Sequence, residues 1–185
     1  VKDLSIHFGG VKAVQNVSFN IDSGIVYAVI GPNGAGKTTL FNLITGVYKP
    51  TTGEIHLDGE AIGGKSPNEL ATRGVARTFQ NLQICMNMSA VENVMVGAHL
   101  RLDRNLVKAA LRFPGLKKRD AELREEAAEL MRFVGLGQYV EARADAMSYG
   151  ALKRLEIARA LAMKPRLIFL DEPAAGLNPK ETIEV

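Results

Sequence analysis

The chain has 185 residues, of which 46% are hydrophobic and 23% are charged. A chain of this length and composition can bury a substantial core without disulfides, and the composition argues against a disordered protein. No apolar run approaches the roughly 20 residues of a membrane-spanning helix, and the first residues lack a secretory signal pattern, so we expect a cytoplasmic protein. A formal net charge of +3 is far from the dense basic stripe of a nucleic-acid-binding domain, and we expect no nucleic-acid partner.

One cysteine, Cys85, has no cysteine or histidine near it at metal-ligand spacing, and we expect it to be a small buried apolar residue. The chain starts at Val1 and stops at Val185 inside a predicted helix. We therefore expect a fragment of a longer protein.

The first part of the chain is rich in predicted strands. Alternating or continuous apolar residues predict strands over residues 14–21, 26–30, 53–59 and 75–79. The Asp58-Gly59 pair at the end of the third strand predicts a tight turn. Helical spacing predicts helices over residues 37–45, ended by Gly46, and over residues 68–73.

From residue 89 onward the pattern becomes helical. Helices are predicted over residues 90–100, 119–134 and 151–163, and a loop containing Pro114 and Gly115 separates the first two. Residues 167–170 predict a short buried strand that leads directly into an acidic pair. This order predicts an α/β fold in which a helical block, residues 89–163, interrupts a core formed by residues 1–88 and 164–185.

The strongest local signal is a glycine-rich loop that follows an apolar predicted strand and opens a predicted helix. Its residues are Gly31, Pro32, Asn33, Gly34, Ala35, Gly36, Lys37, Thr38 and Thr39. Glycines let backbone N–H groups turn inward and approach phosphate oxygens, and the helix N-terminus adds positive potential. Lys37 would contact the β and γ phosphates, and Thr38 would offer its hydroxyl to Mg²⁺. The alternative, an ordinary glycine-rich turn, does not require the strand, the helix and the Gly-Lys-Thr ending together.

The acidic pair is Asp171 and Glu172, at the end of a strand, where active sites of parallel α/β sheets gather. Asp171 would orient Mg²⁺, and Glu172 would polarise the attacking water as a general base. An acidic pair at a strand end is common in many proteins. The functional interpretation therefore depends on the phosphate loop upstream.

The order of these segments resembles that of ABC transporter ATPases over nearly the whole chain. The matching segments are the phosphate loop, Gln80 after residues 75–79, Ser148-Tyr149-Gly150 before residues 154–161, and Asp171-Glu172-Pro173. The resemblance implies a P-loop NTPase (RecA-like) core with an N-terminal antiparallel β subdomain and an inserted α-helical subdomain that carries the signature motif. It also implies ATP and Mg²⁺ as cofactors, and a switch histidine located beyond Val185.

The resemblance implies roles for individual residues. Phe8 stands where the family places an aromatic residue that stacks on adenine; without the resemblance it would be a core phenylalanine. Gln80 matches the glutamine that contacts Mg²⁺ and the attacking water. Ser148, Tyr149 and Gly150 match the signature loop, which caps the γ-phosphate of ATP bound to the opposite subunit, and the alternative for them is a simple helix cap.

Two positions depart from the usual signature: Tyr149 replaces glycine and Ala151 replaces glutamine. Tyr149 and residues 8–10, 77–81 and 171–182 resemble the LivG-type ATPases of branched-chain amino acid importers. The resemblance implies a homo- or heterodimer of ATPase subunits with ATP sandwiched between them, in which residues 174–178 link the two sites. It further implies contact with transmembrane permease subunits and a peripheral place on the inner face of the cell membrane.

Other functions stay open at this stage. An importer of another small polar solute, such as urea, would carry a similar ATPase, because the ATPase meets the solute only through its permease. A non-transport ABC ATPase acting in DNA repair or on ribosomes usually joins two ATPase units or inserts long coiled coils, and neither is visible in this sequence. The basic segment 101–119 is either a solvated surface or a contact with anionic lipid beside the permease.

Overall fold

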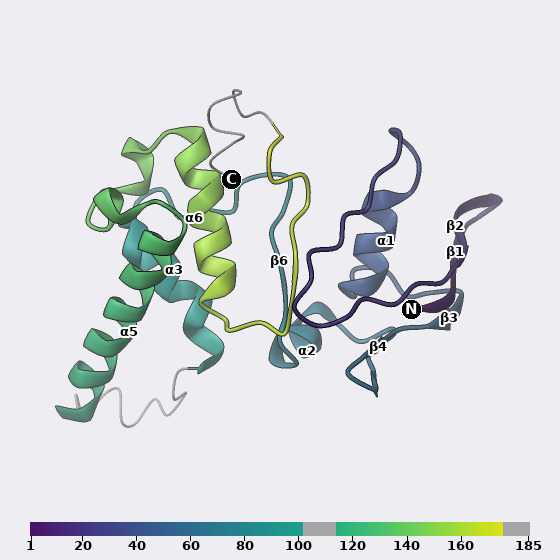
Figure 1. The fold of residues 1–185 in the computed structure, drawn as a ribbon, viewed down its shortest axis with the longest axis horizontal. Helices are drawn as coiled ribbons and strands as arrows, with labels where there is room; N and C mark the ends of the chain where they lie inside the picture. The colour runs from purple at the N-terminus through teal and green to yellow at the C-terminus, as the bar shows by residue number, and fades with distance from the viewer. Residues whose placement is uncertain (102–113, 176–185) are drawn as a thin grey trace. The chain divides into compact units, whose positions relative to one another are not determined.

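The structure, a computed structural model, describes residues 1–101 and 114–175, except for the side chains of residues 114–117 (Figure 1). The chain divides into two compact units, Val1–Arg73 and Gly74–Val185. Two predictions fall partly outside the described residues, since the basic segment includes residues 102–113 and the linking loop includes residues 176–178. The predicted subdomain limits stay predictions.

A three-stranded antiparallel sheet opens the first unit. In this sheet β1 (Lys2–Phe8) lies between β2 (Val11–Val17) and β3 (Thr52–Glu54). Gly9 has a φ of 56°, a left-handed conformation that favours glycine and lets β1 turn tightly into β2. The predicted N-terminal antiparallel β subdomain is therefore confirmed.

The predicted helix over residues 37–45 is confirmed as α1 (Lys37–Ile44), which lies against β2. It buries Leu40, Leu43 and Ile44. Gly46 follows the helix with a φ of 77°, as is common just beyond a helix C-terminus. A Cβ at this position would collide with the backbone oxygen of Lys65, so both conformation and close packing require glycine there.

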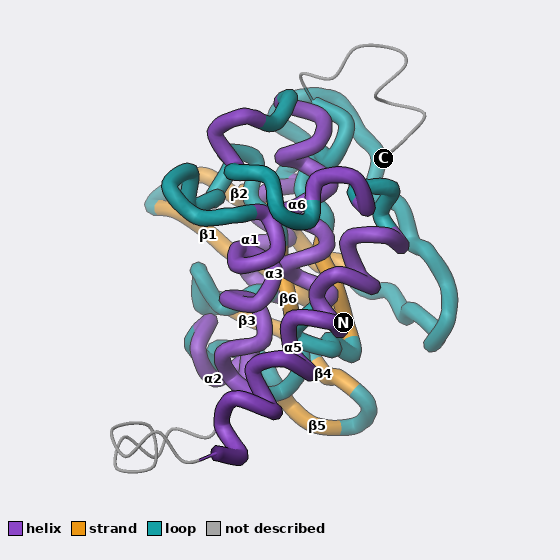
Figure 2. Tube along the Cα trace, turned by 90° about the vertical axis from the view of Figure 1, so that its left-hand side faces the viewer, coloured by secondary structure: helices purple, strands orange, loops and turns teal. Residues whose placement is uncertain are grey.

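Two short elements complete the first unit. The hairpin of β4 (His56–Leu57) and β5 (Glu60–Ala61) turns through the predicted Asp58-Gly59 pair, where both residues have positive φ (Figure 2). The helix α2 (Pro67–Thr72) begins with a capping box between Ser66 and Glu69. The turn and a helix over residues 68–73 were predicted from the sequence. The single strand predicted over residues 53–59 is instead divided between β3 and β4, and β5 was not predicted.

The predicted strand over residues 26–30 is wrong. A strand requires a hydrogen-bonded neighbour, and among the described residues no strand pairs with this segment. Its apolar side chains are consequently accessible, and Val26 and Ile30 are 100% and 91% exposed. The apolar run resembled a buried strand in the sequence, but the pairing partner could not be read from it.

The second unit contains a parallel pair of strands, β6 (Val75–Arg77) and β7 (Leu167–Phe169). Their register places Arg77 opposite Phe169, and the N–H of Thr78 donates to the carbonyl of Phe169 at 2.9 Å. Because the strands are parallel, the residues that follow both of them emerge at one edge. This edge positions the acidic pair.

Helices α3 (Ala90–Gly97), α5 (Pro114–Phe133) and α6 (Tyr149–Leu161) pack together in the second unit (Figure 1). The short 3₁₀ helix η1 (Ala98–Arg101) follows α3, and η2 (Gly137–Tyr139) and η3 (Ala144–Ala146) lie between α5 and α6. The fully buried side chains of this cluster include Val91, Val94, Met131, Leu136 and Leu155. No helix in the described part of the chain is both long and apolar enough to cross a membrane.

Two sequence predictions in this unit are wrong. Pro114 and Gly115 begin α5 instead of forming a loop, which the missing N–H of proline permits in the first turn of a helix. Cys85 is exposed. Its backbone N–H and carbonyl are both bonded to the buried side chain of Asn93, at 2.9 and 3.0 Å, and this contact holds the main chain against α3 while the thiol lies outside.

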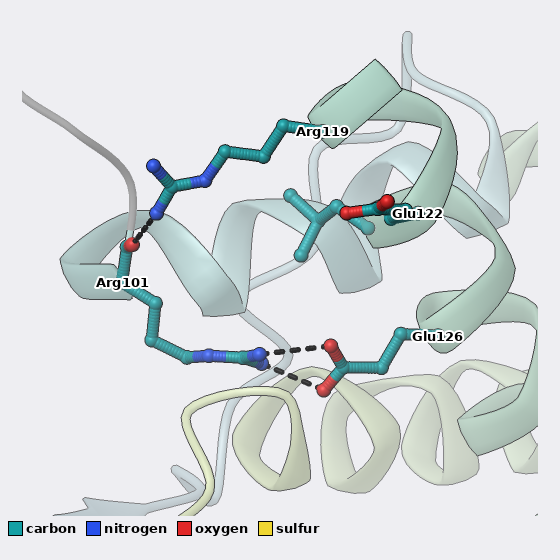
Figure 3. A pocket seen from close by; sticks show the side chains of 5 residues that line it. Arg101, Arg119, Glu122 and Glu126 are labelled. Atoms are coloured by element: carbon teal, nitrogen blue, oxygen red, sulfur yellow. Dashed lines mark hydrogen bonds and ion pairs between the residues drawn. The ribbon is translucent and has the colours of Figure 1, made fainter. Parts of the chain in front are cut away.

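An ion-paired cluster joins α5 to the end of η1 (Figure 3). Arg101 donates to both carboxylate oxygens of Glu126, at 2.7 and 2.8 Å, and also to the carbonyl of Ala162 at 3.0 Å. Lys164 lies 3.0 Å from the same carboxylate. The hydrogen bonds from Arg101, opposed by partial burial and aided by Lys164, lower the pKa of Glu126 to about 2.

We predict that Glu126→Gln destabilises the protein at neutral pH. The folded-state pKa of Glu126 is depressed, so its contribution is complete above pH 4.5 and is lost as the pH falls toward about 2. The loss at pH 7 should be roughly 1–3 kcal/mol and should shrink through that window. Urea unfolding across pH 2–7, with the exposed Glu122→Gln as control, measures it, and equal, pH-independent effects of both variants would contradict the assignment.

Candidate functional site

The glycine-rich loop adopts a backbone that only glycine enters easily. Gly34 and Gly36 have φ angles of 82° and 85°, in the left-handed region. A Cβ on Gly36 would lie 2.6 Å from the carbonyl oxygen of Ala13, whereas a Cβ on Gly34 would meet nothing within 4 Å. Gly36 is therefore required by conformation and by packing, and Gly34 by conformation alone.

Gly36 is also the N-cap of α1, and no side chain caps this helix start. The first-turn N–H groups of such a helix are donors without intrahelical acceptors, and they favour an anion. Lys37 folds back over the loop, where its ammonium donates to the carbonyls of Gly31 and Pro32 at 2.7 and 2.9 Å. The loop thus combines backbone donors and a positive charge, which is the chemistry that a phosphate chain requires.

The acidic pair follows β7, as predicted. Asp171 is 9% exposed, and one of its carboxylate oxygens accepts a hydrogen bond from Arg77 at 2.8 Å. Its backbone N–H donates to the hydroxyl of Thr78 at 3.3 Å. Glu172 has a φ of 48°, an uncommon conformation for a residue with a side chain, and such strain is concentrated at functional sites.

The structure brings Gln80 and Glu172 together. The side-chain amide of Gln80 donates to a carboxylate oxygen of Glu172 at 3.2 Å, although the two residues are 92 positions apart in the chain. The parallel pairing of β6 with β7 explains this contact, because Gln80 and Glu172 each lie three residues beyond the end of their strand. Sequence reasoning missed Arg77 as the partner of Asp171, and only the strand pairing could have revealed it.

Ser148 is the N-cap of α6, and its hydroxyl accepts a hydrogen bond from the N–H of Ala151 at 3.3 Å. Tyr149 is 44% exposed, and the ammonium of Lys153 lies 5.8 Å from the centre of its ring. Gly150 is buried. The helix cap is thus present, and the role of these residues toward a nucleotide stays a prediction.

Phe8 is not the core residue that its apolar side chain alone would suggest. It is 44% exposed at the end of β1, and its ring contacts Tyr48 edge to face with the centroids 5.2 Å apart. The phosphate loop and Phe8 belong to the first unit, whereas Gln80, Ser148 and the acidic pair belong to the second.

A phosphate-type loop at a helix start and an acidic pair after a parallel strand define the class of P-loop nucleotide-binding proteins. Residues 14–175 match the family model of the ABC transporter. The chain belongs to the ABC transporter family and is one of its ATPases.

The chain is similar in sequence, over nearly its whole length, to two transport ATP-binding proteins. It is 45% identical over 182 residues to BraF, a high-affinity branched-chain amino acid transport ATP-binding protein of Pseudomonas aeruginosa, covering 98% of this chain and 71% of the relative. It is 41% identical over 185 residues to LivG of Escherichia coli, which carries the same description, covering 100% of this chain and 72% of the relative.

Solved structures show the same fold. The ADP conformation of an ATP-binding cassette of an ABC transporter superposes with a TM-score of 0.82 at 34% identity, covering 99% of this chain and 71% of that chain. A dimeric cassette in a post-hydrolysis state, bound to ADP and phosphate, has a TM-score of 0.76 at 26% identity and covers 99% of this chain and 77% of that chain. The predicted P-loop NTPase fold is confirmed.

We predict that Gly36→Ala destabilises the nucleotide-free chain more than Gly34→Ala. Both substitutions impose a left-handed conformation on alanine, at about 1–2 kcal/mol, but only Gly36→Ala also drives a Cβ against the oxygen of Ala13. Urea unfolding of the two variants beside the parent chain measures the difference. Equal losses would show that the contact with Ala13 does not constrain the loop.

Proposed function

We propose that this ATPase powers the uptake of branched-chain amino acids through a membrane permease. The observation that carries the proposal is the 45% and 41% identity, over nearly the whole chain, to two branched-chain amino acid transport ATP-binding proteins. The ATPase would lie in the cytoplasm on the inner face of the cell membrane, held there by permease subunits. It would pair with a second ATPase subunit, a proposal supported by the similar dimeric cassette that holds ADP and phosphate.

The phosphate loop would bind the phosphates of ATP. Its residues, from Gly31 to Thr39, would supply backbone N–H groups, and Lys37 would exchange its bonds to the carbonyls of Gly31 and Pro32 for bonds to phosphate oxygens. Phe8 is exposed and oriented by Tyr48, so it could stack on the adenine. These contacts would account for nucleotide binding by the first unit.

Thr38, Gln80 and Asp171 would hold Mg²⁺. A hydroxyl, an amide oxygen and a carboxylate are the hard oxygen donors that Mg²⁺ prefers, and this ion commonly binds through one or two protein groups with water and phosphate completing its shell. The ion would neutralise charge on the phosphates. Arg77 supports this role because it fixes the orientation of the Asp171 carboxylate.

Glu172 would act as the general base that accepts a proton from the attacking water. Gln80 donates its amide to one oxygen of that carboxylate, and the other oxygen would accept the proton of the water. Ser148, Tyr149 and Gly150 would face the γ-phosphate of ATP on the second subunit, where the hydroxyl of Ser148 and the first N–H groups of α6 offer an anion site. Hydrolysis would then require both subunits.

We predict that Glu172→Gln, in the full-length protein reconstituted with its permease in vesicles, retains ATP binding but loses hydrolysis and leucine uptake together. The loss should be on the order of 10²-fold or more, because the amide cannot accept the proton while the phosphate loop is unchanged. Phosphate release, labelled leucine uptake and equilibrium ATP binding give the three readings. The exposed Glu129→Gln in α5 is the matched control and should behave as the parent protein.

Near-normal turnover in Glu172→Gln would remove Glu172 from the proposed chemistry. Uptake of urea in place of leucine, valine or isoleucine by the parent transporter would contradict the proposed solute and leave the ATPase assignment intact.

A further inference from the structure

Three charged side chains lie along one face of α6 at three-residue spacing: Lys153, Glu156 and Arg159. Lys153 and Glu156 are only 3% and 2% exposed, and the side chain of Arg159 is 20% exposed. Buried charges cost free energy unless they are paired and hydrogen-bonded. The hydrogen-bond partners of these side chains therefore indicate which segment of the chain this face of α6 binds.

Lys153 and Arg159 both bind the backbone of one segment, residues 79–83, which follows β6 and contains Gln80. Lys153 donates to the carbonyls of Gln80, at 2.8 Å, and of Phe79, at 3.5 Å. Arg159 donates to the carbonyl of Gln83. We call Lys153 and Arg159, with Glu156 between them, the backbone clamp.

Glu156 occupies the centre of the backbone clamp. Burial raises its pKa, while the charges of Lys153 and Arg159 act in the opposite direction. Arg159 lies 3.7 Å from its carboxylate. The acid thus lies between the two cations that bind the carbonyls of the segment.

The segment 79–83 contains Gln80, one of the two proposed catalytic residues, and Gln80 contacts the other, Glu172. The main-chain carbonyl of Gln80 is held by Lys153, and the side-chain amide of Gln80 donates to Glu172. The same ammonium of Lys153 also lies over the ring of Tyr149, the residue that follows the N-cap of α6. One lysine therefore connects the first turn of α6 with the backbone of Gln80.

We propose that Lys153 is a positioning residue for ATP hydrolysis, which fixes Gln80 against Glu172 and ties that pair to the N-terminal turn of α6. The inference rests on the proposed function of Gln80 and Glu172. Lys153 would act through the main chain of Gln80, not through contact with the nucleotide or the water. A displacement of the first turn of α6 would then be transmitted to the glutamine.

The test uses Lys153→Met in the full-length protein reconstituted with its permease, since methionine keeps the length of the side chain and removes the donors. We expect kcat to fall at least about tenfold while the KM for ATP changes by less than about threefold. Lys153→Arg, which restores donors toward the two carbonyls, should recover most of the turnover. Lys118→Met, a change at an exposed lysine of α5, is the control and should leave kcat unchanged.

A double-mutant cycle with Gln80→Ala separates positioning from a purely structural role. If Lys153 acts through Gln80, the double variant should hydrolyse ATP no more slowly than Gln80→Ala alone. Additive losses, or parallel losses in kcat, KM and melting temperature, would overturn the proposal. If Lys153→Met does not fold, Arg159→Met carries the same cycle from the more exposed end of the backbone clamp, with the same two outcomes.

Failure of this inference can be distinguished from failure of the proposed function. Loss of turnover in Gln80→Ala together with normal turnover in Lys153→Met would overturn the positioning role alone. Normal turnover in both Gln80→Ala and Glu172→Gln would overturn the catalytic assignment on which it rests.

Discussion

The parallel pairing of β6 with β7 is the constraint on which the second unit's site depends. Arg77 lies opposite Phe169, and this register carries Gln80 to Glu172 and Arg77 to Asp171 across more than 90 positions of sequence. A slip of one residue would turn the side chains of a strand to the opposite face and separate these partners. The geometry of the acidic pair is thus a consequence of two three-residue strands.

Such short strands cannot hold the following segments by themselves, and α6 supplies the additional contacts. The segment 79–83 has irregular backbone, so its carbonyl and N–H groups need partners outside a regular ladder. Lys153 and Arg159 provide partners for its carbonyls, and Lys153 is buried with its charge. Apolar residues at positions 153 and 159 would avoid the burial of charge. The carbonyls of Gln80 and Gln83 would then lack these hydrogen-bond donors.

Turns and helix ends that depend on residues close in sequence could be predicted from the sequence. The left-handed glycines of the phosphate loop, the Asp58-Gly59 turn and the helix ended by Gly46 all followed from residues close in sequence. The acidic pair and Gln80 were also predicted, from motif order and resemblance. Contacts between distant segments could not be predicted in this way: the Arg77–Asp171 pair, the backbone clamp and the absence of a partner strand for residues 26–30 within the described chain depend on tertiary pairing.

We expect the phosphate chain, bound by the loop of the first unit, to dominate nucleotide recognition. Titration calorimetry of the full-length protein with ATP, ADP and adenosine, repeated on Lys37→Met, tests this most directly. We expect ATP and ADP to bind, adenosine to bind at least about 100-fold more weakly, and Lys37→Met to lose at least about tenfold in ATP affinity. Adenosine binding as tightly as ATP, or an unchanged ATP affinity in Lys37→Met, would contradict the account.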